Sequence, residues 1–422
     1  MSVALVSAVD PYPTDAGKKI VLAGFLEYFA ERYGPNKVHY IKVGSAPPHQ
    51  EFPVNLHMVP GPSRAAVIGG IATRVTTGRS SLQEAFLGSR RTRIAIRRII
   101  DEIGPQLQVY DTVRMAQYAP GHVAEQQICY LDDLFSERYD RMLKAAKRYP
   151  DVDSSPLGNF AEHVPRLLRP LGANKTTQTA LLRLERAMVR RSEDRAARNF
   201  RRCLLVNEDE VGLLTRRSGV APGRIQCVPP LLATTPAADR RYRGAPEFVF
   251  LGDLGLAHND DGLRWFLREI WPIVLTRLPA AHLRVIGPNA GTEALALAGE
   301  VADSVSMDGY VPDLGEALGQ AAALVNPLRF GSGIKLKVIE ALNRSLPTVS
   351  TPIGAEGISG GPGEGVLVGN EPTEVADLLC SLTDPERNAE FSAEARNHFL
   401  ATYSRQAVFD AYDRAFGPPA TQ

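Results

Sequence analysis

Short apolar runs alternate with helical segments along the second half of the chain, and this alternation constrains the fold more than any other feature. Apolar runs of strand length lie at residues 248–254, 283–287, 304–311, 323–328 and 346–352. Segments with the apolar spacing of a helix separate several of them, at residues 260–278, 314–321 and 337–345. Strands and helices that alternate in this way build a parallel sheet covered on both faces. We therefore predict an α/β fold for this half.

The first half repeats the pattern less regularly. A short apolar run at residues 3–9 leads through a glycine-bearing loop to a helical segment at 20–34, and further strands are predicted at 38–43, 107–113, 127–131 and 203–207. A chain of 422 residues is too long for one ordinary core and fits two domains. Residues 61–81 and 149–180 are less periodic, and we interpret them as insertions.

The domain boundary is predicted from one segment without periodicity. Residues 228–247 are rich in Pro, Ala and charge and are the best linker candidate. We therefore expect a first domain at 1–227 and a second domain at 248–402. The last segment, about 403–422, has helical spacing, and we expect it to pack back onto the first domain.

Charge is distributed unevenly along the chain. Residues 1–202 hold 30 Lys and Arg against 20 Asp and Glu, whereas the remainder holds 18 against 27. Basic clusters at 90–98 and 183–202 supply the excess and could face nucleic acid, an anionic membrane or a phosphate-bearing substrate, or could be solvated helix faces. Aromatic residues are not interleaved with the basic ones, so we expect no nucleic-acid partner.

Composition sets the expected compartment. No run reaches the ~18 apolar residues that a membrane span needs, and the start MSVALVSAVDPYP lacks the basic and apolar regions of a signal peptide. We expect a cytoplasmic protein, with peripheral contact at the inner membrane face as an option. The four cysteines are scattered singly, which predicts no metal cluster.

The segment NPLRFGSGIKLKVIEAL, residues 326–342, is the strongest candidate for chemistry. A strand leads through a glycine loop to a helix, and such a helix start offers unpaired amides and a positive dipole end to an anion. Gly331 and Gly333 would let the backbone approach that anion, while Arg329, Lys335 and Lys337 add donors. The chemistry is that of a diphosphate site. The spacing matches neither the phosphate loop of nucleoside triphosphatases nor the dinucleotide fingerprint.

The same segment resembles the donor-site signature of the retaining family-four glycosyltransferases, in the branch with a Gly-rich, Lys-bearing loop. The run GSGIKLKVIEAL is followed by PTVSTPIGAEGI, as in that signature. Four other stretches agree in order: PYPTDAG, CLLVNEDE, FLGDLGLAHNDDGLRWFLREIWP and GYVPDLGEAL. The resemblance implies the GT-B fold, in which two Rossmann-like parallel-sheet domains face a cleft and the second holds the sugar nucleotide.

The resemblance also implies roles for individual residues. Glu340 matches the glutamate that binds the nucleotide ribose, and Tyr310 and Val311 match the turn that meets the base. Gly17 matches the glycine of the first loop. The other donor-site positions that the resemblance implies are Gly331, Ser332, Gly333, Lys337, Ala355 and Glu356.

Three departures from the family pattern change the expected contacts. Ser332 stands where many members have a sugar-binding glutamate, and Asp253 and Asn259 lie near the usual diphosphate-binding Arg and Lys. We infer that Arg329, Lys335 and Lys337 supply the charge instead, with Lys335 the direct phosphate ligand.

The third departure lies in the first domain. Asp132 and Asp133 follow a strand where the family often has a histidine. One of them could contact the sugar or the acceptor, and we assign that role to Asp132. Alternatively, the two residues only end the strand and cap the next helix. His258 is a loop residue that could reach the phosphates, and Glu340 could alternatively serve only its helix start, where acids are favoured.

The expected reaction is retaining transfer of a sugar from a nucleoside-diphosphate sugar to a hydroxyl acceptor, without a metal or other cofactor. Lys335, Arg329 and Asp132 are the expected catalytic residues. The acceptor could be a saccharide, a lipid-linked group or another hydroxyl compound. Two alternatives stay open: a nucleotide-binding partner subunit that has lost turnover, and a sugar-nucleotide epimerase of the same architecture.

Overall fold

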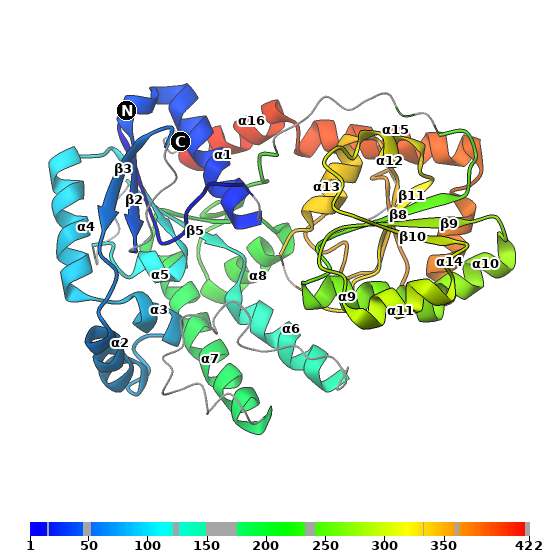
Figure 1. The fold of residues 1–422 in the computed structure, drawn as a ribbon. Helices are drawn as coiled ribbons and strands as arrows, with labels where there is room; N and C mark the ends of the chain where they lie inside the picture. The colour runs from blue at the N-terminus through cyan, green and yellow to red at the C-terminus, as the bar shows by residue number, and fades with distance from the viewer. Residues whose placement is uncertain are drawn as a thin grey trace. The chain divides into compact units, whose positions relative to one another are not determined.

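A computed structural model describes residues 1–14, 17–44, 52–120, 126–148, 175–232, 240, 242–331, 333–358 and 363–417. These residues divide into two compact units (Figure 1). The first domain lies within Met1–Leu143, Ser155–Leu232 and Val408–Gln422, and the second within Lys144–Ser154 and Ala233–Ala407. The unit boundary at Leu232 falls inside the segment predicted as linker, of which residues 233–239 and 241 lie outside the described residues. Most of the predicted insertion at 149–180 also lies outside them.

The first domain is built on a parallel sheet with the strand order β3-β2-β1-β4-β5-β6-β7. Every residue of β1 and β4 is buried, as expected for central strands covered on both faces. The strands are β1 (Val3–Ser7), β2 (Val38–Val43), β3 (Asn55–Val59), β4 (Leu107–Asp111), β5 (Gln127–Asp132), β6 (Arg202–Leu205) and β7 (Ile225–Cys227).

Helices separate most of these strands, and several of them lie between β3 and β4. The helices are α1 (Gly17–Tyr33), α2 (Arg64–Gly70), α3 (Leu82–Leu87), α4 (Arg90–Ile103), α5 (Thr112–Ala116), α6 (Phe135–Arg148), α7 (Lys175–Asn199) and α8 (Glu208–Ser218), with a short 3₁₀ helix η1 (Pro35–Lys37) and a short π-helix η2 (Ile71–Val75). Cys129 and Cys203, far apart in the sequence, are directly registered partners on β5 and β6 and belong to the core.

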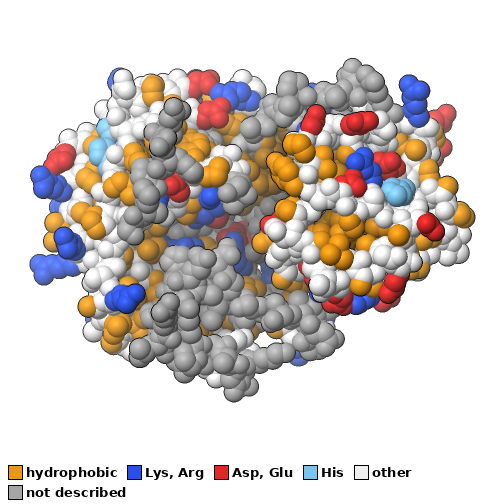
Figure 2. Space-filling view, viewed as in Figure 1, with side chains coloured by type: hydrophobic (Ala, Val, Ile, Leu, Met, Phe, Trp, Pro, Cys, Tyr) orange, Lys and Arg blue, Asp and Glu red, His pale blue; other side chains and the backbone are white. Residues whose placement is uncertain are grey.

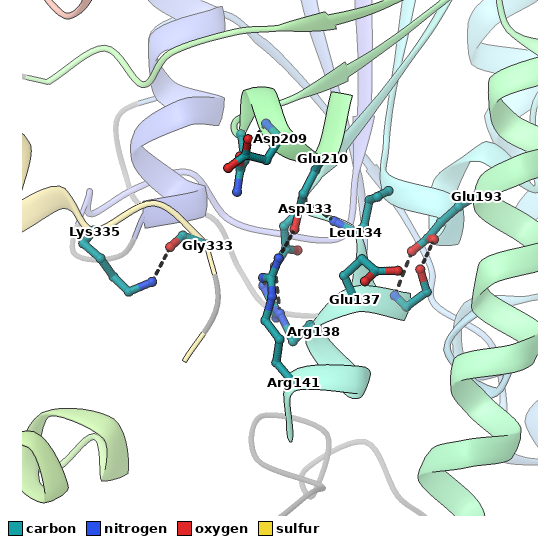
Figure 3. A network of polar contacts seen from close by, with 12 residues as sticks. Asp133, Leu134, Glu137, Arg138, Arg141, Glu193, Asp209, Glu210, Gly333 and Lys335 are labelled. Carbon is teal, nitrogen blue, oxygen red and sulfur yellow. Dashed lines mark hydrogen bonds and ion pairs between the residues drawn. The ribbon is translucent and has the colours of Figure 1, made fainter. Parts of the chain in front are cut away.

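Buried carboxylates fix the start of α6. Glu193 of α7 accepts hydrogen bonds from the backbone N–H and the hydroxyl of Ser136, at 3.0 and 2.5 Å. Glu210 of α8 accepts from the N–H of Leu134 at 2.8 Å (Figure 3). These bonds satisfy N–H groups that a helix start leaves without an intrahelical partner. The loop between β5 and α6 is therefore held by residues from two other helices.

The second domain contains a parallel sheet with the order β10-β9-β8-β11-β12-β13. Its strands are β8 (Glu247–Leu251), β9 (His282–Ile286), β10 (Val305–Gly309), β11 (Ala323–Asn326), β12 (Thr348–Ser350) and β13 (Val366–Val368). Its helices are α9 (Ala257–Trp265), η5 (Phe266–Ile270), α10 (Trp271–Arg277), α11 (Thr292–Glu300), α12 (Gly315–Gln320), α13 (Leu336–Asn343), α14 (Pro372–Ser381) and α15 (Pro385–Thr402). Trp271 is fully buried in this core, beside Phe248 and Phe266.

The last helix, α16 (Arg405–Phe416), packs on α1 (Figure 1). The rings of Tyr412 and Phe416 make edge contacts with Phe25 of α1, with ring centroids 5.0 and 5.1 Å apart. The hydroxyl of Tyr28 donates a hydrogen bond to Asp413 at 2.7 Å. The end of the described chain thus completes the aromatic core of the first domain.

The predicted fold class, two Rossmann-like parallel-sheet domains, is confirmed. Strands β3, β7 and β13 and helices α11 and α14 are among the elements that were not predicted, because the strands are short and the two helices have no strong apolar period. No helix in the described ranges is long and apolar enough to cross a membrane.

Candidate functional site

The strand order of the second sheet marks a reversal point between β8 and β11. From β8 the chain continues to β9 on one side, and later returns to β11 on the other. Ligands of open α/β sheets bind beyond the carboxyl ends of the strands at such a point. The segments that lie there are residues 252–259, which include the first residues of α9, and residues 327–335, which lead into α13.

The glycine loop has a backbone conformation that favours glycine at two positions. Gly331 and Gly333 have φ angles of +139° and +74°, which side-chain-bearing residues rarely adopt. Lys335 occupies the N-cap position of α13, is only 7% exposed, and donates from Nζ to the Gly333 carbonyl at 2.6 Å (Figure 3). Ser332 lies outside the described residues.

Lys337 is half-buried and is held by one polar and one aromatic contact. Its Nζ donates a hydrogen bond to Oδ1 of Asn259 at 2.9 Å and lies 5.0 Å from the centre of the Phe250 ring. Burial, with a further contribution from repulsion by Lys335, lowers the pKa of Lys337 to about 7. The side chain of Lys337 therefore changes between its charged and its neutral form near pH 7.

Asn259 orients the side chain of Lys337, a role that was not predicted from the sequence. The residue is 4% exposed, and its Nδ2 donates to the Asp253 carbonyl at 2.9 Å, which turns Oδ1 toward Lys337. Asp253 accepts hydrogen bonds from the Gly255 N–H and from Asn289. The two residues that depart from the family pattern thus hold the loop and a lysine in place.

His258, which is the second residue of α9 and not a loop residue as predicted, forms a cluster with Lys335 and Lys337, in which the two lysines are the cationic members. Burial lowers the pKa of His258 to about 4, and the two lysines add to the effect. A Cβ atom placed on Gly331 would lie 3.9 Å from both the His258 Cβ and the Lys335 Cε, so the glycine loop passes directly over these groups. A bound anion would relieve the repulsion within this cluster.

Arg329 is held by a carboxylate on α9. Its Nε donates to Asp261 at 2.9 Å, and its Nη2 makes a second close contact with the same carboxylate. Asp261 is only 2% exposed. The carboxylate of Asp261 thus balances the charge of the Arg329 guanidinium. The positive charge available to a bound anion is that of Lys335 and Lys337.

Glu340 lies in the second turn of α13. The alternative interpretation, an acid that stabilises the helix start, is therefore wrong. Its Oε1 accepts a hydrogen bond from Nε of Arg344 at 2.7 Å, and its side chain is 23% exposed. The carboxylate is anchored on one side and accessible to solvent.

The remaining predicted donor-site residues follow other strands of the same sheet. Tyr310 is 76% exposed and, with Val311, follows β10 directly. Ala355 is buried and Glu356 half-buried in the turn after β12. All four lie at the carboxyl end of the sheet, as Lys335 does.

The first sheet has its own reversal point, between β1 and β4. Gly17 is the first residue of α1, at this end of the sheet. The neighbouring Lys18 forms ion pairs with Asp111 at the end of β4, at 2.7 Å, and with Asp132 at the end of β5, at 3.8 Å. Neither Lys18 nor Asp111 was predicted as a site residue, although Lys18 directly follows a loop glycine and Asp111 ends a strand, which were usable signals.

Asp132 and Asp133 have different environments. Asp133 is 2% exposed and is bound by Nε and Nη2 of Arg138 at 2.8 and 2.6 Å (Figure 3). Asp132 has a φ angle of +72°, and its Oδ1 accepts a hydrogen bond from the Tyr130 hydroxyl at 2.7 Å. Neither carboxylate caps α6, since Glu193 and Glu210 do so, and the capping interpretation is wrong.

No group of three or more His, Cys, Asp and Glu side chains in the described part of the chain is arranged to hold a metal ion.

Lys337 generates a testable pH effect. With a pKa of about 7 the free side chain is mostly neutral near pH 8, and a bound diphosphate favours the charged form, so binding should take up a proton. Calorimetry of inorganic diphosphate at that pH, in two buffers of different ionisation enthalpy, measures this uptake. Lys337→Met corrects for protons released by the ligand itself, and equal proton exchange in the variant and the natural protein would contradict the assignment.

Most of the second domain is similar to a known protein family. Residues 245–384 match the model of the family Glycosyl transferases group 1. A protein of Klebsiella pneumoniae, described as an uncharacterized 44.6 kDa protein in the cps region, is 30% identical over 171 residues. That match covers 39% of this chain and 44% of the relative, so it spans less than half of the relative's length.

Solved structures match over nearly the whole chain. WaaG, a glycosyltransferase involved in lipopolysaccharide biosynthesis, has a TM-score of 0.54 at 14% identity and covers 98% of this chain and 100% of its own. A Staphylococcus aureus TarM variant, in complex with fondaparinux, alpha-GlcNAc-glycerol and UDP, has a TM-score of 0.61 at 10% identity, with 99% and 100% covered. HepE of Anabaena, in complex with UDP and glucose, has a TM-score of 0.53 at 10% identity, with 98% of each chain covered. Residues 245–384 thus match the model of the family Glycosyl transferases group 1, and the chain shares the two-domain GT-B fold of these solved glycosyltransferases.

Proposed function

We propose that this protein transfers a sugar from a nucleoside-diphosphate sugar to a hydroxyl acceptor, with retention at the anomeric carbon, in the synthesis of a polysaccharide, glycolipid or other glycoconjugate. The observation that carries the proposal is the cluster of Lys335, Lys337 and His258 at the reversal point of the second sheet. A diphosphate is the anion that fits two ammonium groups beside a glycine loop.

The cluster suits the leaving group of glycosyl transfer. When the bond to the sugar breaks, negative charge builds up on the diphosphate. Donors that are already aimed at those oxygens stabilise the transition state more than the ground state. Lys335 and Lys337 are fixed by Gly333 and Asn259, so they need little reorganisation when that charge develops. We propose that they do this without a metal ion.

Retention requires no protein nucleophile in this proposal. A phosphate oxygen of the donor takes the proton of the acceptor hydroxyl, and the enzyme aligns the two reactants on one face of the sugar. Asp132 is the residue of the first domain that we assign to the acceptor. Its carboxylate is the less buried of the two aspartates, whereas Asp133 is bound in its pair with Arg138.

The donor nucleotide is proposed to be a uridine diphosphate sugar. TarM and HepE, which share the fold, were solved with UDP. Glu340 would accept hydrogen bonds from both ribose hydroxyls, a role that suits a carboxylate because it offers several acceptor sites. Tyr310 and Val311 would form the turn beside the base. The proposed acceptor is a saccharide or a lipid-linked group.

Glu340 provides the test of the nucleotide assignment. Glu340→Gln should weaken binding of UDP about tenfold or more, because charge-assisted hydrogen bonds to the ribose are lost, and should leave inorganic diphosphate binding unchanged. Calorimetry with both ligands measures this difference. Glu300→Gln, at an exposed carboxylate at the end of α11, is the matched control. Equal losses for UDP and for inorganic diphosphate would refute ribose recognition by Glu340.

A basic surface on the first domain is a candidate for contact with a membrane that carries the acceptor. Figure 2 shows Lys and Arg side chains along the edge of this domain where Figure 1 places α4. The helix buries Thr92 and Ile96 against the domain, while Ile94 is 60% exposed. Its exposed arginines are Arg90, Arg91, Arg93, Arg97 and Arg98. We propose that this face binds anionic lipid headgroups.

Lipid binding can be measured by sedimentation with vesicles. Replacing Arg93, Arg97 and Arg98 by Gln should lower the partition onto vesicles that contain phosphatidylglycerol by roughly tenfold or more, since each basic side chain contributes about 1 kcal/mol near such a surface. Binding should also fall with added salt. The matched control replaces three exposed arginines of the second domain, Arg268, Arg277 and Arg387. Equal partition of both triple variants would remove α4 as the contact.

A further inference from the structure

Lys18 is the second residue of α1 and lies at the reversal point of the first sheet. Its ammonium is 2.7 Å from Oδ1 of Asp111 and 3.8 Å from Oδ2 of Asp132. The same ammonium lies 5.9 Å from the centre of the Tyr130 ring. One cation is therefore shared by two carboxylates from neighbouring strands.

The other oxygen of each carboxylate is bound by a hydroxyl group. Ser7, at the end of β1, donates to Oδ2 of Asp111 at 2.6 Å. Tyr130 donates to Oδ1 of Asp132 at 2.7 Å. The network joins the ends of three adjacent strands, β1, β4 and β5, and Lys18 is its central member.

The position of Asp132 depends on its surroundings. A φ angle of +72° is uncommon for a residue with a side chain and persists only where neighbouring structure enforces it. Burial raises the pKa of Asp132, and the charge of Lys18 acts in the opposite direction. The other charged groups that face it are Asp133, which raises that pKa, and Arg138, which lowers it. Arg114 of α5 and Asp111 of β4 complete the charged surroundings.

We propose that Lys18 is a positioning residue, which holds the carboxylate of Asp132 in place to accept a hydrogen bond from a second, non-reacting hydroxyl of the acceptor. This inference rests on the proposed glycosyl transfer. A lysine suits the position because its compact ammonium has three donors that can reach separate carboxylates. The planar guanidinium of an arginine favours two hydrogen bonds to a single carboxylate. Lys18→Arg therefore keeps the positive charge but changes how that charge is divided between Asp111 and Asp132.

The first readout is the titration of Asp132 itself. Carbon-13 NMR of protein labelled at the aspartate carboxyl carbons gives this titration, with the signal identified by its loss in Asp132→Asn. In Lys18→Met the midpoint should rise by about one pH unit or more, since an opposite charge at this distance lowers a carboxyl pKa by that amount. Lys18→Arg should restore most of the shift. Lys19→Met, which removes the adjacent lysine, should leave the midpoint unchanged.

The second readout is the pH profile of sugar transfer. The acidic limb of kcat/KM for the acceptor should move to higher pH in Lys18→Met and return toward its natural position in Lys18→Arg, while the KM for the donor stays constant. An unchanged Asp132 midpoint in Lys18→Met would overturn the proposal. An equal loss of kcat/KM at every pH would also overturn it, because that is the result of a purely structural role. If the natural protein transfers no sugar, the proposed function fails, and the titration still decides whether Lys18 controls Asp132.

Discussion

Two lysine ammonium groups lie near each other, largely shielded from water, at the reversal point of the second sheet. Lys337 is held between Asn259 and the Phe250 ring, Lys335 by the Gly333 carbonyl, and burial together with repulsion lowers the pKa values of Lys337 and His258. Confinement of like charges costs free energy, which a bound diphosphate would return. The folded domain is therefore expected to bind an anion at this cluster.

The surrounding structure keeps that cluster in place. The strand order brings the ends of β8 and β11 together, so that residues 252–259 and 327–335 meet. The positive φ angles of Gly331 and Gly333 let the loop turn over His258, and the pair of Arg329 with Asp261 ties its first part to α9. At the corresponding reversal point of the first domain the described contacts include two carboxylates, Asp111 and Asp132, that share the single ammonium of Lys18. The two domains thus offer a cationic site and a carboxylate-bearing site.

The sequence was informative wherever a local pattern controls the structure. Alternating apolar runs predicted the parallel sheets, and the order strand, glycine loop, helix was predicted around residues 331 and 333. The sequence was uninformative about partners far apart in the chain. Lys337 binds a residue 78 positions away and Arg329 one 68 positions away, and no local period encodes such pairs. The same reason explains why Lys18 and Asp111, 93 positions apart by their numbers, were missed.

Diphosphate binding by the second domain is the central claim, and one calorimetric measurement tests this binding most directly. UDP, GDP, dTDP and ADP would be titrated, with EDTA present, into the natural protein and into Lys335→Ala. We predict selective micromolar binding of one nucleotide, UDP by our proposal, weakened about tenfold to a hundredfold in the variant, since a charge-assisted hydrogen bond to phosphate is lost. Absence of binding to all four, or binding that Lys335→Ala leaves unchanged, would contradict the account.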